Sequence, residues 1–397
     1  METITLGQLL EAVGGTLLGE FQDREALIQR VDTDSRNIHE GALFIPLIGE
    51  RFDGHAYINA ALEGGAVGCI TARERENYLP GKFYVKVSNT QKALRDLAAW
   101  YKGRFDIPFV AITGSVGKTT AKDMVAAVLG TKYKVLKTEG NFNNNVGLPL
   151  TLLRLTGEHQ ICVLEMGMDK AGEIDYLAEI VKPDVGIITN IGDAHIERLG
   201  SRENIFKAKC ELLPHVKGNG LLVLNGDDEL LSTLRGHTTV PAVFYGKEEG
   251  LEYQAHITGG DSVSHILCRL TTPAMDREVR IPALGEHMIY PTLAATAVAE
   301  RFGLTADEIE QGLTQFVPTR MRMNVLRRGE GITILDDTYN ANPQSMRAAV
   351  SVLADSLGEW KVAVLGDMLE LGACTRAEHY RVGRLAAANS DLVYAYG

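Results

Sequence analysis

The sequence has 397 residues, of which 45% are hydrophobic and 23% are charged. These values are ordinary for a globular protein, and the length predicts roughly two or three domains. The net charge of -11 argues against a nucleic-acid partner, because proteins that bind phosphate backbones usually carry a basic surface. No run approaches the roughly 18 apolar residues that span a bilayer, so we expect neither membrane insertion nor secretion.

The cysteines are scattered and form no C-x-x-C pair; they are Cys69, Cys162, Cys210, Cys268 and Cys374. An odd number of dispersed thiols indicates a reducing compartment, because disulfide frameworks use paired cysteines. We therefore expect a cytoplasmic protein.

The first 86 residues predict a small α/β domain that ends near the turn at Pro80 and Gly81. A helix is expected from Thr90 to Tyr101, inside a central domain of residues 87–316. This domain alternates short apolar strands with helices, which predicts a parallel sheet covered on both faces. Its buried strands are expected at Phe109–Ile112, Ile161–Glu165, Val185–Thr189 and Leu221–Leu224.

Between about residues 240 and 282, polar and apolar residues alternate, so we expect an antiparallel extension of this sheet. Helices from about His287 to Phe302 and from Thr305 to Phe316 close the central domain. The third domain, residues 317–397, begins with a hairpin and continues with a helix, a strand, a helix and a final strand at Leu392–Tyr396. The predicted strands of the hairpin are Asn324–Arg328 and Ile332–Leu335.

The segment ITGSVGKTT, from Ile112 to Thr120, joins a β-prone run to a helix-favouring run. Loop amides and a helix N-terminus can bind an anion, while Lys118 supplies positive charge and Thr119 can ligate Mg²⁺. The common pattern G-x-x-x-x-G-K-[ST] is not fully met, since Ile112 stands at the first glycine position. A GKT triplet can also be a simple helix start, but the flanking strand and helix favour binding of ATP or GTP. The residues expected at the phosphates are Gly114, Ser115, Val116, Gly117, Lys118, Thr119 and Thr120.

Polar residues follow two other buried strands. Glu165 ends one of them, at the edge where α/β folds bind ligands, and a buried carboxylate needs a metal or a hydrogen-bond network. Glu165 could instead cap the next helix. Asn190, Asp193 and His195 follow the second strand, and the residues alone leave His195 open between a structural and a functional role.

Lys209 falls on the apolar face of the predicted helix NIFKAKCELL, together with Ile205, whereas Lys207 points away. A lysine on such a face must pair, extend its ammonium to water or lose its proton. The spacing alone favours extension to water. A neutral amine could react with carbon dioxide to form a carbamate.

Several runs resemble one known family. The chain resembles the Mur ligases, which share a phosphate loop of TG-x-x-GKT type, matched here by Thr113 to Thr119. Four more runs are similar to the member that joins D-alanyl-D-alanine to UDP-N-acetylmuramoyl-tripeptide: GNFNNNVGLPLTLL, VLEMGMDKAGEI, DDTYNANPQSM and VLGDMLELG. The last two are the specific ones. With DTDSR (residues 32–36) and GERFDGH (residues 49–55), the resemblance covers almost the whole chain.

The resemblance implies a set of roles at the nucleotide. Lys118 and Thr119 would hold the β- and γ-phosphates and one Mg²⁺, with Glu165 completing that metal site. His195 would ligate a second Mg²⁺, helped by Lys209, which matches the carbamylated lysine of the family. Asn190 would orient reacting groups, Asn225 would meet the adenine, and Arg322 and Asp337 would contact phosphate and ribose.

The resemblance also implies the substrates, UDP-N-acetylmuramoyl-tripeptide and D-alanyl-D-alanine, joined through an acyl phosphate at the expense of ATP. Ser35, Arg36, Asn143 and Asn144 would face the UDP-sugar peptide, and Tyr339, Asn340 and Asn342 would line the cleft between domains. Two alternatives stay open: another amino-acid ligase of the Mur or folylpolyglutamate type, or a P-loop nucleotide switch without catalysis. We expect a monomer. The sequence does not say whether the third residue of the tripeptide is lysine or diaminopimelate.

The sequence departs from the family pattern at two places. Met288 and Pro291 stand where the family commonly has asparagines, which puts a nucleotide or hinge contact in doubt. The third domain, which the resemblance implies is Rossmann-like, stops at Gly397 immediately after a predicted strand. We therefore expect this domain to be incomplete, with an exposed sheet edge and part of the D-alanyl-D-alanine pocket missing.

Overall fold

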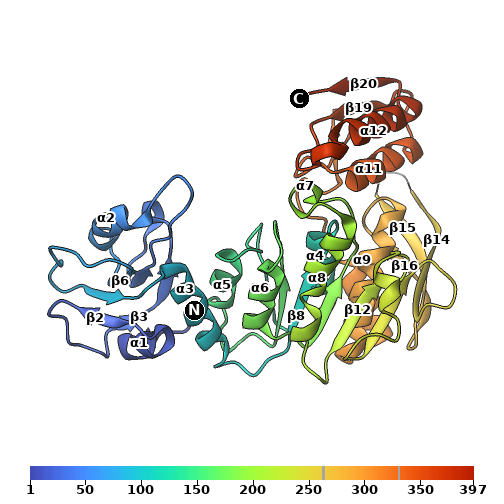
Figure 1. The fold of residues 1–397 in the computed structure, drawn as a ribbon. Helices are drawn as coiled ribbons and strands as arrows, with labels where there is room; N and C mark the ends of the chain where they lie inside the picture. The colour runs from blue at the N-terminus through green and yellow to red at the C-terminus, as the bar shows by residue number, and fades with distance from the viewer. Residues whose placement is uncertain (262–263, 330) are drawn as a thin grey trace. The chain divides into compact units, whose positions relative to one another are not determined.

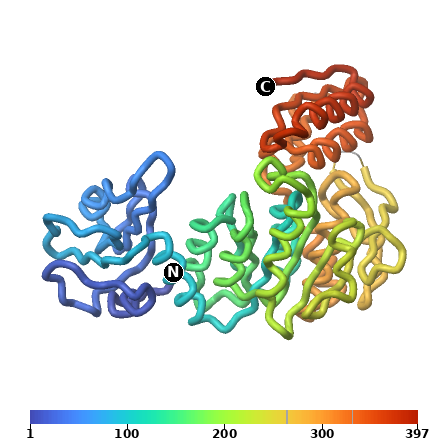
Figure 2. Tube along the Cα trace, viewed as in Figure 1, coloured from blue at the N-terminus to red at the C-terminus, as the bar shows by residue number. Residues whose placement is uncertain are grey.

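The structure, a computed structural model, describes residues 1–261, 264–329 and 331–397. The chain divides into two compact units. The first contains Met1–Ile107 and Thr138–Gln160, and the second contains Pro108–Lys137 and Ile161–Gly397. Figure 2 shows the path of the chain, which leaves the second unit after Lys137 and returns to it at Ile161. The domain boundaries expected near residues 86 and 316 stay a prediction.

The first unit has a five-stranded sheet with the strand order β2-β7-β6-β5-β4 in the described part of the chain. All neighbours are parallel except β2 and β7. The strands are β2 (Thr16–Leu18), β4 (Arg30–Asp32), β5 (Ala42–Phe44), β6 (Gly68–Thr71) and β7 (Phe83–Lys86), with a separate pair β1 (Ile4–Thr5) and β3 (Leu27–Ile28). The helices are α1 (Leu6–Val13), α2 (Ile58–Glu63), α3 (Thr90–Lys102) and α5 (Gly147–Leu152). Helix α3 confirms the helix predicted from Thr90, and it lies beside α5 (Figure 1).

The second unit is built on a sheet of nine strands, counted in the described residues, in the order β16-β15-β14-β13-β12-β11-β8-β10-β9. Neighbouring strands from β9 to β14 are parallel, and β14, β15 and β16 are antiparallel. The strands are β8 (Phe109–Thr113), β9 (Val135–Lys137), β10 (Ile161–Glu165), β11 (Val185–Ile188), β12 (Leu221–Asn225), β13 (Ala242–Gly246), β14 (Tyr253–Asp261), β15 (His265–Thr271) and β16 (Asp276–Ile281).

Helices cover both faces of this sheet, which explains its almost uninterrupted apolar strands. One core contains Val110 and Ile112 of β8 together with buried residues of α4 (Lys118–Leu129), α9 (Ile289–Arg301) and α10 (Ala306–Thr314). Val185 and Ile187 of β11 also belong to this core, and successive side chains of a strand point to opposite faces, so Gly186 between them faces the other side of the sheet. A Cβ there would lie 2.8 Å from Val216, close to α6 (Glu173–Val181) and α8 (Arg202–Cys210).

The last part of the second unit contains two small sheets. An antiparallel hairpin pairs β17 (Asn324–Arg328) with β18 (Ile332–Asp336), and β19 (Val362–Leu365) runs parallel to β20 (Leu392–Ala395). Helices α11 (Pro343–Asp355) and α12 (Thr375–Asn389) pack against each other around Val350, Ala363 and Ala386. The predicted hairpin and the order helix, strand, helix, strand are confirmed.

The expected antiparallel extension is only partly correct. The strand β13 is parallel to β12, and β14 is parallel to β13, so the direction reverses only at β15. Alternation of polar and apolar residues indicates a strand with one exposed face but carries no information about direction. Each of β13 and β14 therefore extends the parallel sheet.

Pro291 is compatible with the helix that contains it. It is the third residue of α9, within the first turn, where the backbone N–H groups have no partner inside the helix. Met288, directly before the helix, is buried. In the described part of the chain no helix combines the length and the apolar composition needed to cross a bilayer.

Candidate functional site

The loop between β8 and α4 wraps around the ammonium group of Lys118. The Nζ of Lys118 donates to the carbonyl oxygens of Gly114, at 2.7 Å, and Ser115, at 3.3 Å. Burial lowers the pKa of Lys118, whereas the nearby charge of Glu165 raises it. The loop therefore holds a half-buried positive charge at the N-terminus of α4, the arrangement that binds phosphate oxygens.

Two glycines are required by the shape of this loop. Gly114 has a φ of 150°, and a Cβ at this position would overlap Oγ1 of Thr189 and lie 3.0 Å from Cβ of Thr189. Gly117 has a φ of 79° and precedes α4 as its N-cap. Ile112, which stands at the first glycine position of the common pattern, belongs to β8 and is fully buried. A core residue of a strand therefore replaces that glycine.

Asn190 and Ser115 fix the loop to the end of β11. The side-chain oxygen of Asn190 accepts from the N–H of Val116 at 3.0 Å, and its amide nitrogen donates to the carbonyl of Val116 at 3.1 Å. Oγ of Ser115 accepts from the N–H of Gly192 at 2.8 Å. Both side chains thus support the loop. The expected role of Asn190 at reacting groups stays a prediction.

Glu165 ends β10 beside the phosphate loop, because it pairs in register with Ile112 of β8. Its side chain is 2% exposed, and its charge acts on Lys118. A carboxylate that is buried next to an anion-binding loop offers a hard oxygen ligand, as Mg²⁺ prefers. Glu165 therefore lies at the end of its strand, as the sequence predicted.

Lys209 lies on α8 and is 1% exposed. Its pKa is lowered well below its usual value, first by burial and then by the positive charge of Lys118. The interpretation that the ammonium group of Lys209 extends to water is wrong, because the protein buries the whole side chain, including its end. A neutral amine, the form that reacts with carbon dioxide, is what such burial favours.

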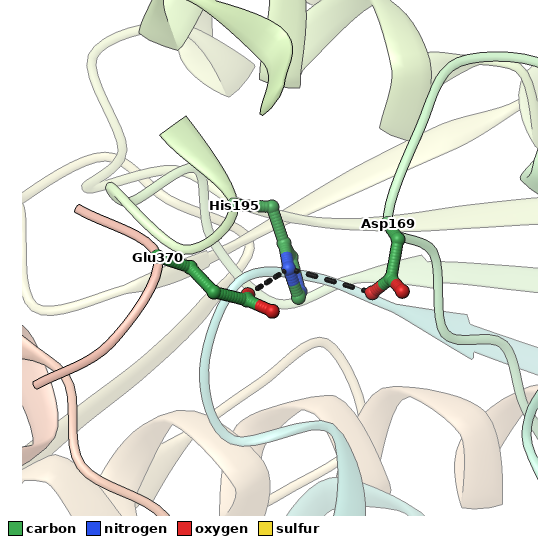
Figure 3. Close-up of side chains that lie close together, drawn as sticks. All are labelled: Asp169, His195 and Glu370. Carbon is green, nitrogen blue, oxygen red and sulfur yellow. Dashed lines mark ion pairs between the residues drawn. The ribbon is translucent and has the colours of Figure 1, made fainter. Parts of the chain in front are cut away.

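His195 lies between two carboxylates. Its Nδ1 is 2.6 Å from Oε2 of Glu370 and 3.5 Å from Oδ1 of Asp169. Figure 3 shows the imidazole nearly edge-on, with Glu370 on one side and Asp169 on the other. Nδ1 is buried and forms no hydrogen bond with the described residues, and the contacts with the two carboxylates are ion pairs only when the imidazole is protonated. The ligand atoms of the three residues lie within 4.8 Å of one another, close enough to share one cation.

The residues around this cluster fix its geometry. His195 has a φ of 65° and Glu370 a φ of 62°, both in the left-handed region. The carbonyl of Glu370 accepts from the N–H of Glu197 at 3.2 Å, which places the loop after β19 against α7 (Ile196–Leu199). Burial lowers the pKa of His195, and the charges of Lys118 and Lys209 lower it further, while Glu370 and Asp169 oppose them. A neutral imidazole, the form that binds a metal, is favoured.

Asp169 has no role predicted from the sequence, and the run around Glu370 contributed only to the resemblance to one family member. Asp169 follows β10 by a few residues, and this position at the end of a parallel strand was the signal that could have indicated it. No sequence signal placed Glu370 next to His195, because their proximity depends on how the last part of the second unit packs.

Among the other predicted residues of the last part, Arg322 acts on the phosphate loop. The charge of Arg322 acts on Lys118, and its guanidinium lies 4.1 Å from the ring centre of Tyr339. Asp337 accepts from the N–H of Met323 at 3.1 Å, and burial raises its pKa. Gln344, for which the sequence indicated no role, reaches Gly192. Its Oε1 lies 2.8 Å from the point where a Cβ would stand if that glycine had one.

Several predicted side chains are used in local structure. Asn342 is the N-cap of α11 and accepts from the N–H groups of Gln344 and Ser345. Asn340 accepts from the N–H of Ala341. Asn225, which is 7% exposed, donates to the carbonyl of Thr189 at 3.0 Å. Their expected contacts with nucleotide and substrate stay predictions.

The predicted substrate residues of the first unit lie on its loops. Arg36 is exposed and pairs with Asp34 at 2.7 Å, next to Ser35 in a short helical turn. The Asn144 side chain accepts from the N–H groups of Val146 and Gly147 at the start of α5, and Asn143 precedes it. The guanidinium of Arg36 is exposed but donates to both carboxylate oxygens of Asp34, and the predicted contacts with the UDP-sugar peptide stay predictions.

Three family models match the chain: the Mur ligase family catalytic domain at residues 27–102, the Mur ligase middle domain at residues 112–299, and the Mur ligase glutamate ligase domain at residues 321–397. The chain is 39% identical to the UDP-N-acetylmuramoyl-tripeptide--D-alanyl-D-alanine ligase of Bacillus subtilis (strain 168), over 99% of this chain and 85% of that protein. It is 36% identical to the enzyme of that name from Escherichia coli (strain K12), over 100% and 86%.

Solved structures agree with this relationship. The crystal structure I of MurF from Acinetobacter baumannii superposes with a TM-score of 0.93 and 35% identity, over 100% of this chain and 86% of that one. The MurF ligase of Thermotoga maritima in complex with ADP superposes with a TM-score of 0.84 and 32% identity, over 92% and 84%. With the phosphate loop, the buried Glu165 and Lys209, and the α/β fold in place, the chain belongs to the Mur ligase family.

Proposed function

We propose that this chain is an ATP-dependent ligase that joins D-alanyl-D-alanine to UDP-N-acetylmuramoyl-tripeptide in the synthesis of peptidoglycan precursors. The observation that carries the proposal is the group of Lys118, Glu165, His195 and Lys209 around one phosphate loop, in which Glu165 and Lys209 are buried and Lys118 and His195 are half-buried. Relatives at 39% and 36% identity have the name of this ligase and match the chain over almost its full length. The reaction would take place in the cytoplasm, which agrees with five scattered cysteines that form no C-x-x-C pair.

ATP is the nucleotide that we assign to the phosphate loop. Lys118 would neutralise charge on the β- and γ-phosphates, and backbone amides at the start of α4 would donate to their oxygens. Arg322 supports this assignment, because its charge reaches Lys118 from the last part of the unit. The structure of a relative with bound ADP agrees with a nucleotide at this kind of loop.

The donor atoms present fit Mg²⁺. A hydroxyl of Thr119 and the buried carboxylate of Glu165 are hard oxygen ligands beside the phosphate loop, and His195 has a buried nitrogen without a hydrogen bond. Thr119 and Glu165 would hold one ion, and His195 with Lys209 would hold a second. Bound Mg²⁺ would neutralise charge on the phosphoryl group during transfer.

Lys209 fits a carbamate. Its amine is buried, and its pKa is lowered first by burial and then by the charge of the cation Lys118. A carbamate would replace this neutral amine by an anion whose charge balances the cation Lys118. That exchange would create a favourable contact between opposite charges.

The reaction requires two anions to meet, the terminal carboxylate of the tripeptide and the γ-phosphate. An oxygen of the carboxylate would attack the γ-phosphorus, a new O–P bond would form, and ADP would leave with the electron pair of the broken bond. The neutral amine of D-alanyl-D-alanine would then attack the acyl carbon. A C–N bond forms, the C–O bond to phosphate breaks, and phosphate leaves with that electron pair as the nitrogen loses its proton. Lys118 would stabilise the charge in the first step.

The test is a coupled assay of ADP release with ATP, UDP-N-acetylmuramoyl-tripeptide and D-alanyl-D-alanine, with the product identified by mass spectrometry. ADP release that needs all three substrates, and a product mass equal to tripeptide plus dipeptide minus water, is expected. Lys118→Ala should lose about 100-fold or more in turnover, because the γ-phosphate charge is no longer neutralised. ADP release that responds to a free amino acid instead of the dipeptide would contradict the proposal.

A further inference from the structure

We propose that Asp123 is a positioning residue, which holds the hydroxyl of Thr319 and thereby fixes the segment that carries Arg322. This segment, residues 318–324, connects α10 with β17 and so leads from the central sheet to the last part of the unit, where α11 lies (Figure 1). The inference rests on the proposed function, in which Arg322 serves the nucleotide phosphates. Asp123 and Thr319 would act through Arg322 and would not touch the substrates.

Asp123 lies on α4, the helix that begins with Lys118 at the end of the phosphate loop. Its buried carboxylate joins side chains that are far apart in the sequence. One oxygen, Oδ1, accepts from Nζ of Lys137 at 2.7 Å and lies 3.3 Å from Nζ of Lys122. The other oxygen, Oδ2, accepts from the hydroxyl of Thr319. A carboxylate on the helix of the phosphate loop therefore holds the start of the segment.

The charges in contact with Asp123 are balanced inside the protein. Lys122, whose side chain is 3% exposed, supplies the buried counter-charge, and Lys137, whose side chain is 43% exposed, keeps its ammonium in contact with water. Both ammonium groups are on the side of Oδ1, which leaves Oδ2 for a neutral donor. A hydroxyl that donates to a charged oxygen forms one of the stronger hydrogen bonds of a protein. The bond from Thr319 is therefore an effective anchor.

The chain after Thr319 folds into a turn that presents Arg322. The N–H of Arg322 donates to the carbonyl of Thr319 at 3.1 Å, and the N–H of Tyr339 donates to the carbonyl of Met321 at 3.2 Å. The guanidinium of Arg322 lies 4.1 Å from the ring centre of Tyr339. Met321 and Met323, on either side of Arg322, have φ values of 59° and 50°. Residues other than glycine persist in this left-handed region where their surroundings fix them, so the direction of Arg322 depends on the anchors of the turn.

The hydroxyl of Thr319 ties the start of this turn to α4. Val317 and Arg320, on either side of Thr319, are exposed. The N–H of Met323 donates to Asp337 at 3.1 Å, which ties the end of the turn to the chain after β18 rather than to α4. Loss of the Thr319 hydroxyl should therefore free the turn from the helix of the phosphate loop without unfolding the segment.

The experiment compares Thr319→Val, which keeps the shape of the side chain without its hydroxyl, with Thr319→Ser, which keeps the hydroxyl. Thr131→Val is the matched control, because it removes a half-buried hydroxyl that donates to a carbonyl at the other end of α4. The substitution is made at Thr319 because Asp123→Asn would leave Lys122 buried without its counter-charge and would destabilise the protein.

The first measurement is amide hydrogen exchange in the peptide that contains Arg322 and Met323, which requires no substrate. Thr319→Val should exchange about 10-fold faster in this peptide, because the turn opens more easily when its anchor is lost. Thr319→Ser and Thr131→Val should exchange at the rate of the unchanged protein.

The second measurement determines kcat for the ligation and Kd for ATP. Thr319→Val should lose about 10-fold in kcat, because a group displaced by about 1 Å acts poorly on the transition state. Its Kd for ATP should change less than about twofold, since Lys118 and the loop amides are unaltered. Arg322→Ala should also lower kcat, and in that background Thr319→Val should lower it no further, because Thr319 acts through Arg322. Thr319→Ser and Thr131→Val should keep the kcat of the unchanged protein.

The outcomes separate the inference from the proposed function. If the unchanged protein joins no dipeptide to the tripeptide, the proposed function fails, and the exchange measurement still decides whether Thr319 anchors the turn. If the unchanged protein is an active ligase and Thr319→Val keeps either its exchange rate or its kcat, the inference alone is overturned. Equal defects in Thr319→Val and Thr319→Ser, or a further loss of kcat in the Arg322→Ala background, would also overturn it.

Discussion

His195 and Glu370 meet at 2.6 Å although 174 intervening residues separate them in the chain, and both have a left-handed backbone. A non-glycine residue in this region costs about 1–2 kcal/mol. The protein therefore stores backbone strain on both sides of one contact. Strain of this kind is concentrated at functional sites, because the surrounding structure enforces it there.

The strained backbone at Glu370 predicts that a glycine at this position stabilises the folded protein. Glu370→Gly should raise the free energy of unfolding by about 1 kcal/mol, because glycine adopts a φ of 62° without the steric penalty. Glu370→Gln should leave it unchanged, since the backbone strain is retained. The measurement is the midpoint of urea unfolding for both variants. Equal midpoints would mean that the left-handed backbone at this position carries no cost.

Gly114 predicts a larger effect in the phosphate loop. Gly114→Ala adds a Cβ that overlaps Oγ1 of Thr189, whose hydroxyl is fixed by donating to the carbonyl of Val116 at 2.6 Å. We expect a loss of about 2–3 kcal/mol in stability and about 10-fold or more in ATP affinity. Gly117→Ala meets no atom within 4 Å and should cost only backbone strain, about 1 kcal/mol.

A second substitution checks the physical reason. Thr189→Ala removes the overlapping oxygen, so the pair Gly114→Ala with Thr189→Ala should recover part of the lost ATP affinity. Calorimetric titration with ATP measures the affinities, and Gly218→Ala, in an open turn, is the matched control. No recovery in the double variant would show that the loss comes from the backbone conformation of Gly114 rather than from the contact.

The sequence predicts the features of this protein that neighbouring residues in the chain determine. It does not predict the features that depend on residues far apart in the chain. The strand β8, the loop after it and the helix α4 are local, so apolar runs, glycines and a lysine were sufficient to predict them. The antiparallel direction predicted for β13 was wrong, because strand direction depends on the connection between strands rather than on the alternation of side chains. Asp169 and Glu370 meet at His195 only through tertiary packing, and no local pattern could have placed them together.

Lys209 shows the same limit in one side chain. Helical spacing placed it on the apolar face, but spacing cannot say how much structure covers that face, and the extension to water that it favoured is wrong. The structure buries the whole side chain next to the charge of Lys118. Burial of this degree is decided by residues far away in the sequence.

Lys209 also gives a prediction about chemistry. Lys209→Ala should lose about 100-fold in ligase turnover, and short carboxylic acids in the buffer should restore part of it if a carbamate is the functional group. Lys207→Ala, on the same helix but exposed, should keep its turnover and show no response to the acids. Nuclear magnetic resonance with isotope-labelled carbon dioxide should detect a carbamate in the unchanged protein and in Lys207→Ala, but not in Lys209→Ala. Turnover lost without rescue and without such a signal would leave Lys209 as an ordinary buried lysine.

His287 predicts how stability depends on pH. Burial lowers its pKa to about 4, compared with about 6.5 in an unfolded chain. Between these values the unfolded state binds a proton that the folded state does not, so stability must fall as the pH falls from about 6.5 to 4. Above about 6.5 the histidine is neutral in both states and has no effect on the slope. His195 is shifted in the same direction, so the prediction concerns the part of the slope that depends on His287.

The measurement is the urea midpoint at several pH values for the unchanged protein, His287→Asn and the exposed control His237→Asn. His287→Asn should lose less stability than the unchanged protein between pH 6.5 and about 4, because its side chain has no proton to bind. His237→Asn should keep the full slope. Comparison of the three proteins at neutral pH separates any packing cost of the substitution from its effect on proton binding, since a packing cost is independent of pH. If His287→Asn and the unchanged protein lose stability in parallel, the histidine is protonated as easily in the folded state as in the unfolded one.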